Sequence, residues 1–229
     1  MRIRIFQPKS ASSIESRNPE GYNLVYGGKV EFKSIDDIVS ICNSEFSQPP
    51  GFCGETVTSG NIIEICDESP LKGIYLLNEN GYDAINFDPE MTDKSNTMTV
   101  LILEPLKKPY TAEIKNDYKG LQSVVGGLIE PVYFEPANDA VIFCNEEFLL
   151  NGSFPNRIVG GICIHGTFCI TGNGINDYGE QDSCSLTNEQ INKYTERFSK
   201  NMLITPTSLI NGEIDQIMDD SEDITMIMM

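Results

Sequence analysis

Cysteine and histidine are the residues of this chain that could supply a nucleophile or bind a metal ion. There are seven cysteines, and His165 is the only histidine. Cys163 and His165 would share one face of a strand, but a thiol nucleophile also needs a group that orients its base, and none is evident. Zinc sites usually contain close ligand pairs such as Cys-x-x-Cys, and that spacing is missing among the possible ligands Cys144, Cys163, His165, Cys169 and Cys184. We therefore expect reduced thiols, with no catalytic residue, no metal and no cofactor.

Two glycine-rich stretches, residues 160–166 and 172–174, could in principle hold a phosphate group. Neither is followed by the Lys-Ser or Lys-Thr that completes a phosphate-binding loop. A phosphate site of this kind also needs a helix N-terminus. We interpret these glycines as turn residues.

Arg157 is the residue that could recognise an anion. No other lysine or arginine is near it in the sequence, and the surrounding stretch is acidic. A guanidinium in such surroundings is expected to pair with a carboxylate, either Glu146 or Glu147, or with a bound anion. The sequence therefore leaves two interpretations open. One is a structural ion pair, and the other is a ligand-binding site made of Asn145, Glu146, Asn156 and Arg157.

The first 90 residues show short strands around one helix. Apolar or alternating runs predict strands at residues 2–6, 22–26, 62–65, 74–77 and 82–87. Ser34 is a good N-cap with Asp37 three residues later, and apolar residues then recur at helical spacing. A polar stretch without periodicity follows residue 87, and we place a domain boundary there.

Residues 98–203 mix strands and helices in a second domain. Strands are predicted at residues 99–103, 129–134, 140–144, 148–150 and 166–172. A first helix should bury its apolar positions, Leu121, Val124, Val125 and Leu128. The last helix should begin at Thr187, with Gln190 completing a capping box, and should pair Glu189 with Lys193.

Together these patterns predict an α+β fold of two small domains, over residues 1–90 and 98–203. Each is expected to be a mainly antiparallel sheet with one or two packed helices. Residues 204–229 form an acidic C-terminal tail. Its sparse apolar residues should not offset a backbone entropy cost of about 1–2 kcal/mol per residue, so we expect weak intrinsic order and a capacity to bind partners.

The net charge of −18 is the main indication of what the protein could bind. This charge repels nucleic-acid phosphates and anionic membranes, so we expect neither as a direct partner. No stretch approaches the roughly 18 consecutive apolar residues of a membrane span, and no signal-peptide pattern is present, so we expect a cytoplasmic protein. A partner selected by electrostatics would have a basic surface. The alternative is that the acidity only maintains solubility.

The N-terminal domain resembles the YodL-like domain. The features that carry the resemblance are the opening Arg-Ile-Phe-Gln strand, the strand at residues 22–26, the helix at 35–42, the loop at 50–56, the strand at 62–64 and the final hairpin. In that family the loop usually reads Gly-His-Ser. Here Glu55 stands in the histidine's position, so no role of that histidine carries over.

Residues 98–200 resemble an uncharacterised domain, the unknown-function family 3846. Short motifs in the same order carry this resemblance, at residues 100–105, 108–110, 116–117, 126–130, 145–147, 156–157, 166–168 and 186–187. Both resemblances imply an origin in phages, plasmids or conjugative elements of low-GC Gram-positive bacteria. YodL-like domains imply, in addition, large composite proteins suspected of counteracting host defence.

The expected function is that of a non-enzymatic accessory protein of such an element, which binds a host protein with a basic surface. An anti-defence inhibitor of the anti-restriction or DNA-mimic type would fit. Duplex DNA carries one charge per roughly 1.7 Å of axis, so eighteen excess carboxylates on one face would match about 30 Å of duplex. The alternative is a module that binds or sequesters a small molecule, such as a nucleotide-like anion, at the site around Arg157.

Overall fold

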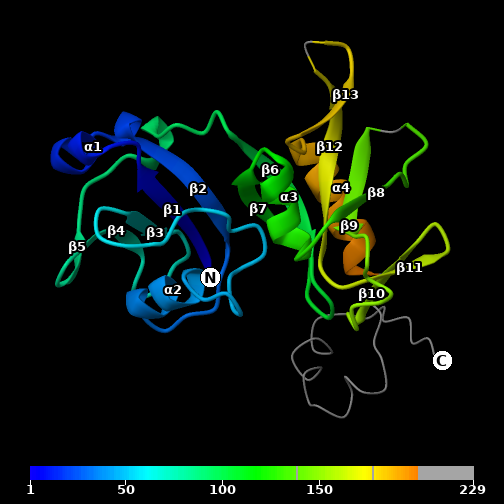
Figure 1. Ribbon diagram of the computed structural model, residues 1–229, viewed down its shortest axis with the longest axis horizontal. Coiled ribbons are helices and arrows are strands. Elements are labelled where there is room, and N and C mark those ends of the chain that lie inside the picture. The colour runs from blue at the N-terminus through cyan, green and yellow to red at the C-terminus, as the bar shows by residue number, and fades with distance from the viewer. Residues whose placement is uncertain (138, 177, 201–229) are drawn as a thin grey trace. The chain divides into compact units, whose positions relative to one another are not determined.

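The computed structural model describes residues 1–137, 139–176 and 178–200, and these residues form two compact units (Figure 1). Unit 1 consists of Met1–Met98 together with Ala112–Ser123, and unit 2 begins with Thr99–Thr111 and resumes at Val124. The expected α+β class is confirmed, with antiparallel sheets and packed helices in both units. The division along the chain differs from the predicted one, because Ala112–Ser123 groups with unit 1. The predicted tail, 204–229, lies outside the described residues.

The sheet of unit 1 has the strand order β5-β4-β3-β1-β2-β7. These strands are β1 (Arg2–Pro8), β2 (Tyr22–Lys29), β3 (Ile62–Ile65), β4 (Gly73–Asn78), β5 (Gly81–Ala84) and β7 (Tyr110–Lys115). Its short helices are α1 (Ala11–Ser16), α2 (Ile35–Cys42), η1 (Pro19–Gly21) and η2 (Pro89–Met91). The N-terminal strand β1 is central, since it pairs antiparallel with both β2 and β3.

The two faces of this sheet bury different apolar clusters. Ile3 and Ile5 of β1 pack on one face with Ile35 and Ile38 of α2. Successive side chains of a strand point to opposite faces, so Phe6 belongs to a second cluster, in which its ring lies 5.7 Å from that of Phe87. Arg2 and Arg4 share the face of Phe6 by the same alternation. This second face therefore holds charged as well as apolar side chains.

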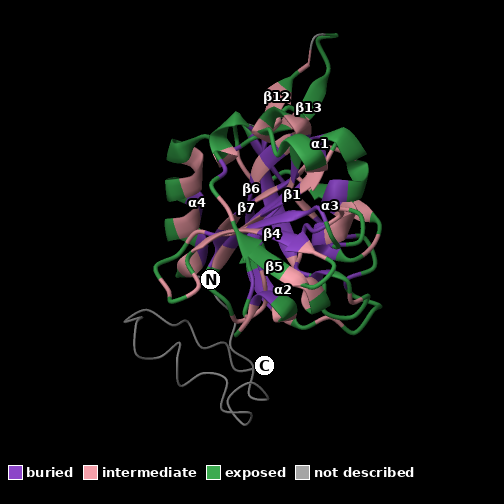
Figure 2. Ribbon diagram, turned by 90° about the vertical axis from the view of Figure 1, so that its left-hand side faces the viewer, coloured by how far each residue is buried: buried purple, intermediate pink, exposed green. Residues whose placement is uncertain are grey.

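The main sheet of unit 2 has the order β6-β12-β9-β8, with β13 paired to β12, and β10 and β11 form a separate ribbon. These strands are β6 (Thr97–Leu103), β8 (Ile129–Val132), β9 (Ala140–Asn145), β10 (Pro155–Val159), β11 (Ile162–His165), β12 (Phe168–Ile175) and β13 (Gln181–Cys184). Tyr194 and Phe198 of α4 (Asn188–Ser199) pack into the core formed by the sheet and the ribbon. Most residues of β6, β9 and β12 are buried, whereas β8 and β13 contain no buried residue. Figure 2 shows the outer face of α4 exposed.

Local sequence signals place the starts of α2 and α4 correctly. Ser34 and Asp37 form a capping box at the start of α2, and Thr187 and Gln190 form one at the start of α4. The prediction that Leu128 is buried in the core is wrong, because this residue is 50% exposed. The intervening helix, α3 (Tyr118–Val125), already ends before Gly126, whose φ of 72° suits a residue without a side chain.

Two further local predictions in unit 2 are wrong. Residues 148–150 form a turn rather than a strand, because the Leu150 N–H donates to the carbonyl of Glu147, only three residues away. Lys193 does not pair with Glu189. Its ammonium lies 2.8 Å from the carboxylate of Glu135, which also binds Arg197. None of the described helices is long and apolar enough to cross a membrane.

Candidate functional site

The four residues of the predicted ligand site do not form an open site. Asn156 and Arg157 are fully buried at the start of the β10–β11 ribbon. Asn145 is buried at the end of β9, whereas Glu146, the next residue, is exposed. Asn156 and Arg157 contact each other through the side-chain oxygen of Asn156.

Arg157 is bound by backbone carbonyls instead of a carboxylate. Its Nε donates to the carbonyl of Phe198 at 3.2 Å, Nη1 to that of Glu104 at 3.0 Å, and Nη2 to that of Lys107 at 2.7 Å. Phe198 is in the last turn of α4, where carbonyls lack partners within the helix. Burial lowers the pKa of Arg157 to about 10.

These contacts correct the interpretation of Arg157 as the partner of Glu146, Glu147 or an anion. The guanidinium has no access to solvent, and most of its donors are already used inside unit 2. Its backbone acceptors come from the loop that follows β6 and from the end of α4. Arg157 therefore fastens these segments together and is not placed to recognise a ligand.

Asn145 also has a structural environment. Its Nδ2 donates to the carbonyl of Val125 at 3.4 Å, and its Oδ1 accepts from the N–H of Glu147 at 2.8 Å. The amide group thereby joins the end of α3 to the turn after β9. A side chain at Gly127 would collide with the amide of Asn145, which explains the glycine at this position.

The cysteine and histidine candidates do not converge either. Within the described part of the chain, no three cysteine, histidine or acidic side chains are placed to hold a metal ion. The Nδ1 atom of His165 lies 3.0 Å from the carbonyl of Ser153, and its ring packs near that of Phe148. Burial raises the pKa of the Cys163 thiol, so it is largely protonated at neutral pH.

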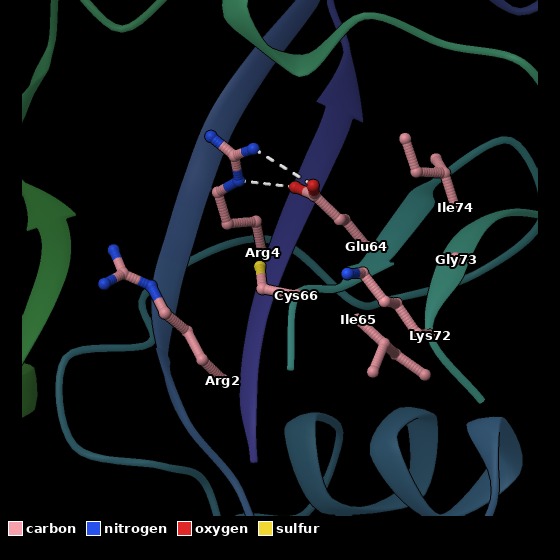
Figure 3. Close-up of a pocket in the computed structure, with 8 residues that line it drawn as sticks. All are labelled: Arg2, Arg4, Glu64, Ile65, Cys66, Lys72, Gly73 and Ile74. Atoms are coloured by element: carbon pink, nitrogen blue, oxygen red, sulfur yellow. Dashed lines mark hydrogen bonds and ion pairs between the residues drawn. The ribbon is translucent and has the colours of Figure 1, made fainter. Parts of the chain in front are cut away.

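A row of charged side chains crosses the second face of the unit 1 sheet, the face that also holds Phe6. Arg4 and Glu64 are directly opposite on β1 and β3, and the guanidinium binds this carboxylate through two nitrogens (Figure 3). Arg2 donates to Glu113 at 3.2 Å. Gly27 of β2 lies opposite Arg4 on one side and opposite Glu113 on the other. A side chain at this position would displace the Glu113 carboxylate.

Arg2, Arg4 and Glu64 of this row line a cavity of about 460 Å³, together with Cys66 and Lys72. Burial of the Cys66 thiol raises its pKa, so it is not an activated nucleophile. Lys72 pairs with Glu68, and Arg4 also binds Glu90. Each cation of the cavity therefore has a carboxylate partner, and the row connects strands and loops rather than offering a vacant charge.

A smaller cleft in unit 1 has a different character. It measures about 280 Å³ and is lined by Gln7, Asn23, Leu24, Val25, Cys53, Gly54, Glu55, Asp93, Ser95, Asn96 and Lys115. These residues come from the end of β1, from β2, from the loop between α2 and β3, from the segment after η2 and from the end of β7. We call it the Glu55 cleft.

The side-chain amide of Gln7 holds the loop of this cleft in place. Its Nε2 donates to the Glu55 carbonyl at 2.8 Å, and its Oε1 accepts from the Glu55 N–H at 3.0 Å. The same Nε2 lies 3.2 Å from Oδ1 of the buried Asn61, which also accepts from the Thr58 N–H. Gly54 fits tightly, since an added Cβ would come within 3.2 Å of Gln7. The loop is thus fixed through its backbone, and the Glu55 side chain remains exposed.

The charged groups of the Glu55 cleft are not equally available. Lys115 is bound to Asp117 at 2.7 Å. Asp93 accepts from Ser95 and pairs with Lys9, and these contacts hold the pKa of its carboxyl well below the usual range. By contrast, no described residue forms an ion pair or hydrogen bond with the Glu55 carboxylate or with the side-chain amides of two other lining residues, Asn23 and Asn96.

The sequence patterns did not predict this cleft, since the predicted ligand site, Asn145, Glu146, Asn156 and Arg157, lies in the C-terminal half. Gln7, Asn23 and Glu55 all lie in the segments that carry the YodL-like resemblance. A usable signal was present: Gln7 ends an apolar strand, and Glu55 follows a glycine in a loop. The pairing of these positions depends on β1 passing beside the loop, which no local pattern reveals.

Comparison with known families agrees with the two-part sequence pattern. Residues 4–87 match the family model of the YodL-like domain, and residues 98–199 match that of a domain of unknown function (DUF3846). The order of the two matches confirms the resemblances found in the sequence. No curated protein and no solved structure gives a significant match.

Proposed function

For a chain that joins a YodL-like domain to a DUF3846 domain, we propose the function of a non-enzymatic accessory protein of a phage or conjugative element. It acts in the cytoplasm by binding a host protein through that protein's basic surface. The target is a defence or nucleic-acid-processing factor, and the mode of action is anti-restriction or DNA mimicry. The site around Arg157 is not proposed for a small anion, because its guanidinium is buried and bound by carbonyls.

The observation that supports this proposal is the unequal pairing of surface charge. Many cations are already bound to carboxylates, namely those of Arg2, Arg4, Lys9, Lys72, Lys94, Lys107, Lys115, Lys193, Arg197 and Lys200. In contrast, several exposed carboxylates have no cationic partner among the described residues, including Glu31, Glu45, Glu79, Glu130, Glu146 and Glu147. The charge available to a partner is therefore negative.

Affinity capture from a host lysate at two ionic strengths tests the proposal. The Debye length falls from about 10 Å at 0.1 M salt to about 3 Å at 1 M, so binding between exposed charges should weaken strongly. We expect a basic protein to be retained at low salt and released at high salt. Competition by duplex DNA for that protein would support DNA mimicry. Absence of a specific partner under both conditions would contradict the proposal.

Two variants with the same net charge separate a binding surface from general acidity. One carries Glu130→Gln, Glu146→Gln and Glu147→Gln in unit 2, and the other carries the same change at Glu31, Glu45 and Glu79 in unit 1. Binding through a defined surface predicts a larger loss with one variant than with the other. If both variants bind like the native protein at low salt, carboxylate recognition is wrong.

A further inference from the structure

The Glu55 cleft has the chemistry of a receptor for a cationic side chain. Its one carboxylate without a partner among the described residues is that of Glu55, and Asn23 and Asn96 add amide groups that are also free of hydrogen bonds there. A guanidinium has five donors and no acceptor, so it is complementary to a carboxylate with neighbouring amide oxygens. We propose that this cleft binds an arginine side chain of the basic partner. The inference rests on the proposed function and adds the site of contact.

The size of the cleft agrees with a single side chain. Its volume of about 280 Å³ lies at or below the lower end of the range of roughly 300–1,000 Å³ that is typical of ligand pockets. Val25 also lines it and is only partly buried, so its side chain can contact the apolar stem of an arginine. Arginine anchors in pockets are frequent among the residues that dominate binding energy at protein interfaces.

The framework of the cleft is already fixed before any ligand enters. Gln7 binds both backbone polar groups of Glu55, and Asn61 accepts a hydrogen bond from the N–H of Thr58, three residues further along the loop. The Glu55 side chain takes no part in these bonds. A change of this side chain should therefore alter the charge of the cleft without unfolding the loop, which makes the proposal testable by substitution.

The cleft is not suited to an anionic ligand. The ammonium of Lys115 is occupied by Asp117, and the second carboxylate of the cleft, Asp93, is held by Lys9 and Ser95. The remaining charge within the cleft is that of Glu55. The net charge of −18 of the whole chain also favours a cation over an anion.

The direct test is an NMR titration with N-acetyl-arginine amide, with the neutral analogue N-acetyl-citrulline amide as a control. We expect saturable shifts of the backbone amides of Glu55, Asn23 and Asn96 with the arginine compound. The citrulline compound should bind at least about tenfold more weakly, or show no measurable binding, because it is neutral and its hydrogen bond to the carboxylate is not charge-assisted. Equal shifts with both compounds would overturn the proposal.

The matched variants are Glu55→Gln and Glu31→Gln, which remove one exposed carboxylate each from unit 1. We expect the first to weaken arginine binding about tenfold and the second to leave it nearly unchanged. Equal effects would mean that only net charge matters, and the proposal would be wrong. Far-ultraviolet circular dichroism and the melting temperature should be the same for both variants, which establishes that the loop is intact.

The same variants distinguish this inference from the proposed function. If a basic partner binds with strong salt dependence but equally to both variants, the cleft is not its anchor and the proposed function stands. If the arginine compound titrates the cleft but no basic partner is captured, the cleft assignment stands and the proposed function is wrong.

Discussion

Gln7 and Glu55 are 48 positions apart in the sequence, yet the side-chain amide of Gln7 forms two hydrogen bonds with the backbone of Glu55. The amide acts as a short piece of additional strand, donating to the carbonyl and accepting from the N–H. This relationship fixes the loop while leaving the Glu55 carboxylate available. It separates the residue that builds the cleft from the residue that gives it charge.

Gln7→Ala should destabilise unit 1 and loosen the loop. The substitution removes both bonds to Glu55 and the contact with Asn61, and a net loss of about 1–2 kcal/mol is expected for bonds that are partly exposed. Urea unfolding measures the loss, and hydrogen exchange at the Glu55 amide should accelerate. The control Gln181→Ala changes an exposed glutamine of β13 and should have little effect. An unchanged exchange rate at Glu55 would contradict the role of Gln7.

Arg157→Met should be far more destabilising than Arg197→Met. Methionine retains much of the apolar volume of Arg157 but leaves buried carbonyls without donors, so a loss of about 3 kcal/mol or more is expected. Arg197 is partly exposed and shares Glu135 with Lys193, so its removal leaves that carboxylate paired and should cost only about 1 kcal/mol. Thermal and urea unfolding of the two variants gives the comparison. Similar losses would mean that Arg157 does not fasten the elements of unit 2.

Thiol labelling should follow burial. Burial raises the pKa of Cys42 to about 12, of Cys144 to about 11 and of Cys169 to about 12, from an ordinary value of 9.0. A raised pKa means less thiolate at pH 8, and these thiols are also inaccessible. Iodoacetamide followed by mass spectrometry should modify the exposed Cys184 first and leave the three buried cysteines unmodified until urea is added. Rapid labelling of Cys42 in the folded protein would contradict the packing around α2.

Acid should weaken unit 1 through Glu90. Hydrogen bonds from Arg4 and Lys94 lower the pKa of Glu90 from 4.5 to about 2 in the folded protein. A lowered folded pKa stabilises the fold above the ordinary value, and this contribution is lost as the pH falls from about 4.5 to about 2. Because Glu90 is largely exposed, the effect should be small.

The Glu90 prediction can be measured as the slope of unfolding free energy against pH over this interval. Glu90→Gln should give a shallower slope than the native protein. Glu79→Gln, which removes an exposed carboxylate without a cationic partner among the described residues, should leave the slope nearly unchanged. Identical slopes for native and Glu90→Gln protein would show that the contact with Arg4 does not shift this carboxyl.

Features that depend on residues close together in the chain were predictable from the amino-acid sequence. The capping boxes at Ser34 and Thr187 involve partners three residues away, and the structure contains both. The hairpin of β4 and β5 likewise follows from its turn residues. In each case one turn of backbone brings the interacting groups together, so the contact does not depend on the tertiary fold.

The partners of long side chains, in contrast, depend on how distant segments pack together. Lys193 reaches Glu135 instead of Glu189, because packing of α4 on the sheet brings a residue 58 positions away within 2.8 Å. Arg157 donates to three backbone carbonyls that lie 41 to 53 positions away, and no charge pattern could identify them. The Glu55 cleft also needs β1, β2, the end of β7 and two loops to meet. Such contacts depend on which segments pack side by side, and the sequence near each residue carries no information about that choice.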